Sequence, residues 1–222
     1  MDYYEQALQI WKAGGDEDAI PLALTYLCVG RAKMLKGELN EALKMTTLSE
    51  SLFLRTIGAD KGFIINVHYA YGNIHYLLKH WDLAYRAYEQ CLKLALHLMP
   101  VHPITRAAYY SIACVEFARD PPNVEGAKGY LEKARAIAQL RSPERDDGSL
   151  TRISWKLATV LESDTLGSYG EEAAALRIRA AISRNMLLAE GEGGAIAWAE
   201  EDESERNREE DMYDALVPLF FR

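Results

Sequence analysis

Apolar and small residues recur at helical spacing along most of the chain, and short polar or glycine-containing turns interrupt them. Such turns fall at Lys36-Gly37, at Lys79-His80, at 120–123 and at 167–170. Each turn lies between two stretches in which apolar positions repeat every three or four residues, the spacing of an amphipathic helix. The pattern therefore predicts an all-α chain made of helical hairpins.

The hairpins are related by a repeat of 42 residues. The heptapeptides YEQALQI and YEQCLKL start at Tyr4 and Tyr88, a separation of 84 residues, which is twice 42. Gly30 and Gly72 are also 42 residues apart. A long period is typical of stacked hairpins, because one hairpin cannot bury its apolar face alone. The register predicts four hairpins and a preceding half repeat, at about 20–56, 62–98, 103–140 and 149–188, with the half repeat at 2–13.

The second hairpin, YGNIHYLLKHWDLAYRAYEQCLKL, resembles a tetratricopeptide repeat (TPR). Gly72 matches the small position of the first helix of that motif, helix A, and His75 matches its aromatic slot. Ala84, Tyr88 and Cys91 match the small, aromatic and small positions of the second helix, helix B. The period exceeds the common repeat of about 34 residues and is similar to that of kinesin light chains and of many fungal repeat proteins. The resemblance covers residues 2 to about 188 and implies a right-handed superhelix, or α-solenoid.

Two positions depart from the motif. The aromatic slot of helix A holds Lys33 in the first repeat and Glu116 in the third. We expect these side chains to reach the edge of the hairpin, or the register to shift locally. The complete predicted fold is about four TPR-like hairpins, an orphan N-terminal B helix at 2–13, and a C-terminal helix that caps or docks.

The resemblance also implies where a ligand binds, because the A helices of a TPR stack line its concave face. Tyr and Trp offer large contact areas with little rotamer entropy to lose, while Arg and Asn donate directional hydrogen bonds to a backbone or carboxylate. We therefore expect a scaffold or adaptor that binds a protein or peptide in this groove. The alternative for any single aromatic residue is a place in the core between hairpins. The predicted groove residues are Arg31, Asn66, Tyr69, Asn73, Tyr76, Arg106, Tyr110, Phe117, Arg152, Trp155 and Thr159.

A second interpretation is an enzyme or small-molecule binder with a pocket inside the helical repeat. Its lining would be His68, His75, Tyr69, Tyr110 and Trp155. No HExxH motif, CxxC pair or P-loop accompanies these residues, and His75 fills a consensus core slot, so no metal, cofactor or catalytic residue is predicted. A closed cavity around the aromatic side chains would favour a pocket over an open groove.

The charge of the chain is concentrated near its C-terminus. Residues 1–188 contain 22 acidic and 22 basic residues, whereas residues 189–222 contain 11 acidic and 3 basic ones, an excess that equals the net charge of −8. The neutral body has no basic surplus for nucleic acid. No apolar run could span a bilayer and no signal peptide begins the chain, so no membrane partner is predicted. We expect a cytoplasmic protein, with the nucleus as the alternative.

The acidic region divides into two segments. Residues 189–210 are poor in large apolar residues, which is typical of a flexible linker. Residues 211–222, DMYDALVPLFFR, are strongly apolar, and we expect them to dock because so much apolar surface seldom stays in water. They would cap the last hairpin, or lie in a groove of the same molecule or of a second subunit. This segment or the half repeat would also allow a homodimer or a self-assembling structural protein.

Overall fold

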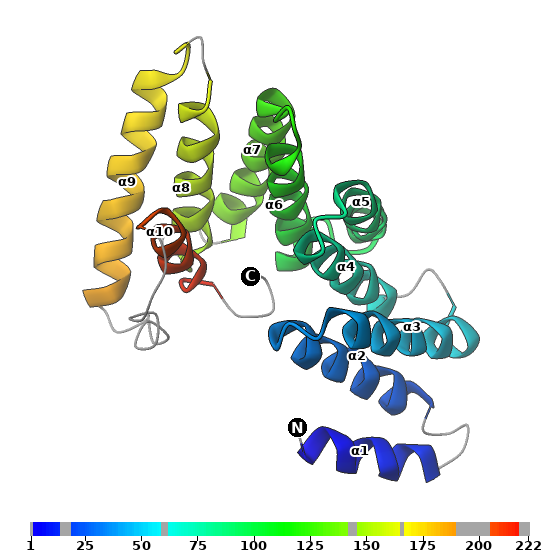
Figure 1. Cartoon of the computed structure of the whole chain (residues 1–222). Helices are drawn as coiled ribbons and strands as arrows, with labels where there is room; N and C mark the ends of the chain where they lie inside the picture. Colours follow the sequence, from blue (N-terminus) through cyan, green and yellow to red (C-terminus); the bar gives the residue numbers. More distant parts are fainter. Residues whose placement is uncertain are drawn as a thin grey trace. The chain divides into compact units, whose positions relative to one another are not determined.

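The computed structural model describes residues 2–13, 19–58, 62–141, 146–164, 167–189 and 205–217. Within these ranges the chain forms ten α-helices and no strand (Figure 1). The helices are α1 (Asp2–Ala13), α2 (Ala19–Leu35), α3 (Leu39–Thr56), α4 (Gly62–Leu77), α5 (Trp81–Leu98), α6 (Pro103–Ala118), α7 (Val124–Arg141), α8 (Ser149–Glu162), α9 (Gly170–Ala189) and α10 (Glu205–Asp214).

The helices fall into two units, the first ending at Pro100 and the second beginning at Val101. In the first unit α2 pairs with α3 and α4 with α5, while α1 packs on α2 and α3 on α4. In the second unit α6 pairs with α7 and α8 with α9, while α7 packs on α8. Chain neighbours thus form hairpins, and the all-α hairpin fold expected from the sequence is confirmed. In TPR terms α2, α4, α6 and α8 are A helices, and α3, α5, α7 and α9 are B helices.

Gly72 and Tyr88 explain why the motif of the second hairpin needs a small residue on one helix and an aromatic residue on the other. A Cβ atom added at Gly72 would lie 2.3 Å from the Tyr88 ring. The ring fills the space above the glycine, is only 3% exposed, and lies 5.6 Å from the ring of Tyr69. The pair therefore sets how closely α4 and α5 approach.

The core of the second unit lies between its two hairpins. Leu131 of α7 and Leu157 of α8 are fully buried in one cluster with small residues such as Ala113 of α6 and Ala173 of α9. Small residues let the helix backbones approach, and the leucines fill the space that remains. This packing fixes the A helices α6 and α8 relative to each other, which matters for the surface described below.

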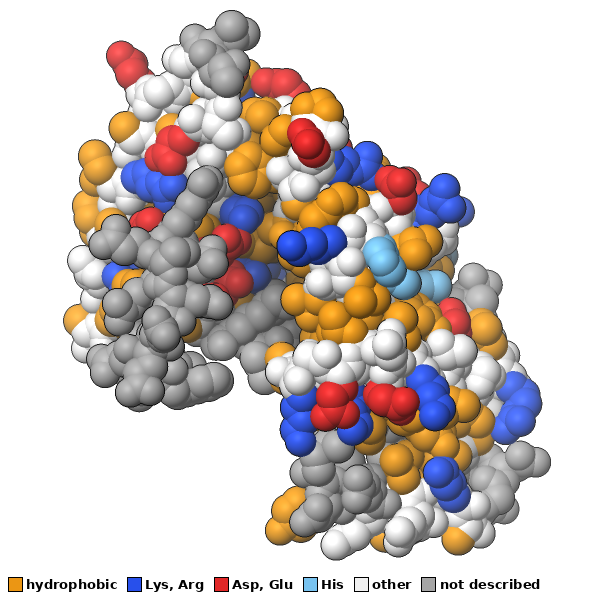
Figure 2. Space-filling model, viewed as in Figure 1, with side chains coloured by type: hydrophobic (Ala, Val, Ile, Leu, Met, Phe, Trp, Pro, Cys, Tyr) orange, Lys and Arg blue, Asp and Glu red, His pale blue; other side chains and the backbone are white. Residues whose placement is uncertain are grey.

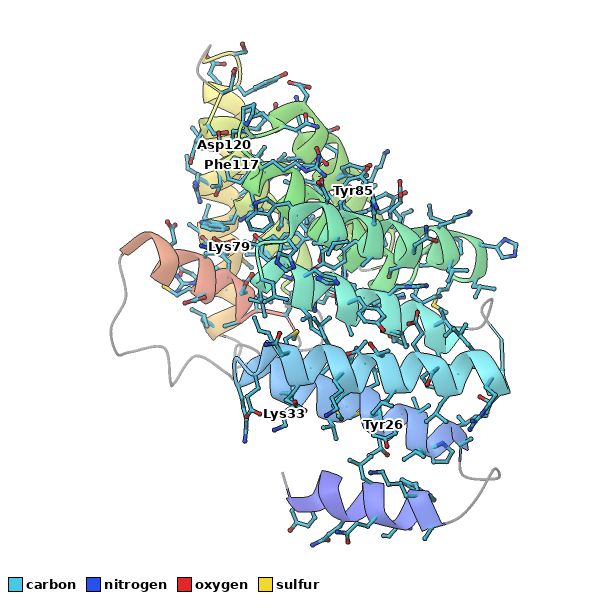
Figure 3. The ribbon with its side chains drawn as sticks, turned by 45° about the vertical axis from the view of Figure 1, so that its right-hand side comes forward. Tyr26, Lys33, Lys79, Tyr85, Phe117 and Asp120 are labelled. Carbon is cyan, nitrogen blue, oxygen red and sulfur yellow. The ribbon has the colours of Figure 1, made fainter. Side chains whose placement is uncertain are left out.

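Lys33 and Glu116, the two residues that depart from the TPR motif, each have a polar partner. Lys33 lies at the end of α2 and forms an ion pair with Glu38 across the turn to α3 (Figure 3). Glu116 is buried near the end of α6 and accepts a hydrogen bond from the Asn123 side chain at 2.5 Å. The first expectation, that these side chains reach the edge of the hairpin, therefore holds for Lys33, while Glu116 is buried and bonded to the turn that follows α6.

The C-terminal region is more helical than its composition predicts. Helix α10 begins at Glu205, inside the segment 189–210 for which the sequence predicts a linker. The correction has a physical reason: Glu210 and Asp214 of this helix are paired with buried cations of α8. Residues 190–204 and 218–222 lie outside the described part of the chain, so the predictions that fall on them stay predictions.

Candidate functional site

The predicted groove residues of the first unit take part mainly in the packing of their own hairpin. Tyr69 is 1% exposed and therefore does not line an open surface. Asn73 accepts a hydrogen bond from the Tyr88 hydroxyl at 2.7 Å, so its side chain is already used within the hairpin. Tyr76 is half-buried and meets the ring of Trp81 edge-on, with 5.3 Å between centroids.

The polar groove positions of this unit are partly accessible. Asn66 and Arg31 are half-buried. Burial lowers the pKa of Arg31, with the neighbouring Cys28 and Tyr69 opposing that change. The cost of burying the guanidinium charge is thus only partly offset here.

The histidines proposed for a pocket lie on α4 and stay in the first unit. His68 and His75 are half-buried, and burial lowers the pKa of each below its ordinary value. The ring of His75 lies 6.4 Å from that of Tyr71 and 5.9 Å from that of His80. The described residues contain no group of three or more His, Cys, Asp or Glu side chains suited to hold a metal ion.

The A-helix surface of the second unit is covered by α10, which packs on α8 (Figure 1). Arg152 of α8 forms an ion pair with Asp214, with 2.6 Å between Nε and Oδ1. One turn later, Lys156 pairs with Glu210. Figure 2 shows acidic and basic side chains next to one another in the region where α10 lies. Arg152, a predicted groove residue, and its neighbour Lys156 are therefore both neutralised by carboxylates of the same chain.

An aromatic stack joins the same two helices. The rings of Trp155 and Tyr213 are 5.1 Å apart and nearly parallel, with an interplanar angle of 19°. Arg177 and Arg184 of α9 lie over them, Arg177 at 5.0 Å from the Trp155 ring and Arg184 at 5.8 Å from the Tyr213 ring. Trp155, Ala180 and Tyr213 are buried together as a small apolar cluster. Cations over both rings add electrostatic attraction to the stack.

The segment that follows α10 continues over the start of α8. Gly148 has a left-handed backbone conformation, with φ +83°, and a Cβ atom there would lie 2.2 Å from the Leu216 carbonyl oxygen. Only glycine tolerates both the positive φ and the close approach of the Leu216 carbonyl oxygen. Residue 148 contacts residue 216, residue 152 contacts residue 214, and residue 156 contacts residue 210. The two segments are therefore antiparallel, and α10 and its extension form one ordered interface with α8.

A small cavity lies beneath this extension. Its space is about 250 Å³ including its opening to solvent, and its lining is Arg106, Ala107, Tyr110, Ser149, Arg152, Ile153 and Val217. Within the described residues, the Tyr110 hydroxyl and the Ser149 hydroxyl have no hydrogen-bond partner. The cavity includes Tyr110 but not His68, Tyr69 or Trp155, so it is not the pocket that the second interpretation of the sequence requires.

The charges around the cavity are balanced within the chain. Arg106 pairs with Asp147 at 3.2 Å. Burial opposes the carboxylate charge of Asp147, but Arg106 and the hydrogen bond donated by the Ser149 backbone N–H hold its pKa below the ordinary value. Burial also opposes the ammonium charge of Lys156, yet the neighbouring Cys114 and Glu210 side chains raise its pKa above the ordinary value. Burial raises the pKa of Tyr110 far above the ordinary value, so its phenol stays a neutral donor.

The two remaining groove residues flank the covered surface. Thr159 donates a hydrogen bond to the Trp155 carbonyl at 3.1 Å and accepts one from Arg177 at 3.0 Å. Phe117 is half-buried near the end of α6 (Figure 3), and the Lys156 ammonium lies 5.8 Å from its ring. The structure thus brings Arg106, Tyr110 and Arg152 together at the cavity. Trp155 lies against Tyr213, and Thr159 is hydrogen-bonded to its backbone.

Sequence reasoning predicted that the tail docks, but it missed Lys156 and the charge pairing that holds the tail on α8. The signal was present as spacing: Arg152 and Lys156 are four residues apart on one helix, and Glu210 and Asp214 are four apart in the acidic tail. Opposite charges with the same helical spacing can pair in two places at once. Considering the tail only as a source of apolar surface hid this match.

No protein-family model and no curated protein matches the chain. Solved structures do match. BtubC (BKLC) from P. vanneervenii has a TM-score of 0.73 at 17% identity, over 83% of this chain and 71% of that chain. Nearly identical TPR-like repeats of a proposed kinesin light chain from Podosopora anserina have a TM-score of 0.61 at 17% identity, over 84% and 94%. The chain has a TPR-like fold.

Stacked hairpins of such a fold create extended surfaces. Among the described helices, none combines the length and apolar character that a membrane crossing requires.

Proposed function

We propose that the chain is a protein-interaction module that binds a protein or peptide segment on the surface of the A helices α6 and α8. One observation carries the proposal: this surface already holds a polypeptide segment, α10, through two ion pairs and an aromatic stack. Buried cations next to aromatic rings are typical of the residues that dominate protein interfaces. The same residues would hold a partner of similar chemistry.

The test removes the two cations without emptying the space that they occupy. Methionine in place of Arg152 and Lys156 keeps an apolar stem of similar length but cannot pair with a carboxylate. We expect the double variant Arg152→Met/Lys156→Met to lose the specific partners that the unmodified chain enriches from a lysate of the source organism, quantified by mass spectrometry.

The control removes the same charge elsewhere. Lys44 and Lys93 are exposed on α3 and α5, and the double variant Lys44→Met/Lys93→Met should keep the partner set. If the Arg152→Met/Lys156→Met variant folds and enriches the same proteins as the unmodified chain, the proposed binding surface is wrong.

Self-assembly is a second candidate because apolar side chains are exposed along α9. Ile178, Ile182 and Met186 are four residues apart and 63%, 56% and 59% exposed; Figure 2 shows hydrophobic side chains along this helix. Tyr3 and Ile10 of α1 are also exposed. Apolar rows of this kind support contact with a second copy of the chain.

A further inference from the structure

Helix α10 has the composition of a ligand rather than of a structural helix. Seven of its ten residues, ERNREEDMYD, carry a charge. A helix that completes a hydrophobic core normally has an apolar stripe along its length. In the described part of this segment only Tyr213 and Val217 are buried, so its specific contacts are mostly charged.

The surface under α10 requires an acidic occupant. Arg152 and Lys156 are 7% and 5% exposed, and a buried cation without a partner is strongly unfavourable. An apolar occupant would remove the carboxylates that now face Arg152 and Lys156. Water alone would expose Trp155, whose ring is now covered by Tyr213. The surface therefore fits a segment with two carboxylates one helical turn apart and an aromatic ring beside them.

The number of residues between α9 and α10, and a core that does not include α10, both allow α10 to separate from α8. Residues 190–204 join the two helices, and a chain of this length can span up to about 50 Å when extended. The hairpins α6/α7 and α8/α9 have their own core, in which Leu131, Leu157 and Leu176 are buried without any contribution from α10. Departure of α10 would uncover the A helices without opening that core.

We propose that α10 and its extension to Val217 are an internal ligand, and that an acidic, aromatic segment of a partner protein binds the α6/α8 surface by displacing them. The inference rests on the proposed function, because it assigns the partner's chemistry and adds a competitor at the same surface. A competitor in the same chain lowers the apparent affinity for the partner. The apparent affinity equals the intrinsic affinity multiplied by the fraction of molecules in which the surface is uncovered. The surface is thus closed by default and open to a partner that competes with α10.

The test uses the full chain and a fluorescent synthetic peptide of residues 205–217 as the probe. In the variant Glu210→Lys/Asp214→Lys, the tail places cations opposite Lys156 and Arg152, and repulsion should detach α10. The control Glu89→Lys/Glu132→Lys makes the same charge change at exposed residues of α5 and α7. We expect the detached variant to bind the peptide at least about tenfold more tightly than the unmodified chain or the control.

Three further measurements keep the test decisive. Hydrogen exchange should show that α6 to α9 stay protected in the detached variant, which excludes general unfolding. In the unmodified chain, a high concentration of peptide should speed exchange in α10 and leave α9 unchanged. A peptide carrying Glu210→Lys and Asp214→Lys should not bind either protein.

Three outcomes would overturn the inference. Equal affinity of the detached variant and the unmodified chain would mean that α10 does not compete. Failure of a folded detached variant to bind the peptide would mean that the surface does not accept α10 as a separate ligand. A dimer that disappears with Glu210→Lys/Asp214→Lys would assign the surface to α10 of a second copy. None of these outcomes decides the lysate experiment, so the proposed function can stand while the inference fails.

Discussion

Individual residues of this chain fix how closely helices approach, and Gly72 offers the clearest case. The Tyr88 ring occupies the space in which a Cβ atom of residue 72 would lie. We expect Gly72→Ala to lower the free energy of unfolding by about 1–3 kcal/mol, because the ring must shift within a close-packed hairpin. Urea unfolding followed by circular dichroism measures the change.

Gly129 of α7 provides a matched comparison with the opposite sign. Nothing lies within 4 Å of a Cβ atom added there. Gly129→Ala should raise the free energy of unfolding by about 0.5–1 kcal/mol, because alanine loses less conformational freedom in a helix than glycine. Equal stability of the two alanine variants would show that the Gly72–Tyr88 contact does not determine the packing of α4 on α5.

At this scale the sequence predicts small and aromatic positions better than it predicts exposure. The 42-residue register identifies Gly72 and Tyr88 correctly, because the spacing of small and aromatic residues reflects helix contact directly. It does not show that Tyr69 is buried while Asn66 stays partly accessible. A helix packed on several sides has no single apolar stripe, so periodicity alone cannot separate a ligand surface from a core.

At the scale of elements, α10 shows how charge pairing orders a segment that composition alone describes as a linker. The side chain of Glu210 is 40% exposed, while its partner Lys156 is buried. Loss of the carboxylate therefore leaves a buried cation, whereas loss of the cation leaves a carboxylate that water can still reach. The sequence predicts that the tail docks, but local patterns cannot predict the partner, since the paired residues are more than fifty positions apart.

This asymmetry predicts the result of a double-mutant cycle. Glu210→Gln should weaken the attachment of α10 by about 1–3 kcal/mol, Lys156→Met should weaken it less, and the double variant should cost less than the sum. Protection of α10 amides against hydrogen exchange measures each step. Glu209→Gln changes the exposed neighbouring carboxylate and serves as the control. If it loosens α10 as much as Glu210→Gln does, the ion pair is not what holds the helix.

For the whole chain, the repeat register predicts the order of the hairpins, because each hairpin depends mainly on its sequence neighbours. It cannot predict which surfaces stay open. That property depends on contacts between distant segments, such as Trp155 with Tyr213, and on contacts with other molecules. The covered A-helix surface of the second unit and the exposed apolar row on α9 are therefore both results of the structure.

The exposed row predicts that the chain associates with itself as its concentration rises. Burying Ile178, Ile182 and Met186 against a second copy would remove apolar surface from water, which favours association. Sedimentation velocity should be measured over a hundredfold range of concentration around the dissociation constants of small interfaces, which are on the order of micromolar. The sedimentation coefficient should rise with concentration. Ile178→Glu/Ile182→Glu should abolish the rise, because it would bury two like charges at the contact.

The matched control for this experiment is Leu96→Glu/Leu140→Glu. It adds the same charges at exposed leucines of α5 and α7 and should sediment like the unmodified chain. The α10 variant Glu210→Lys/Asp214→Lys should also keep the concentration dependence, since α9 rather than α10 forms the expected contact. A sedimentation coefficient that is constant over the whole range would rule out self-assembly through α9 and leave the A-helix surface as the proposed route to a partner.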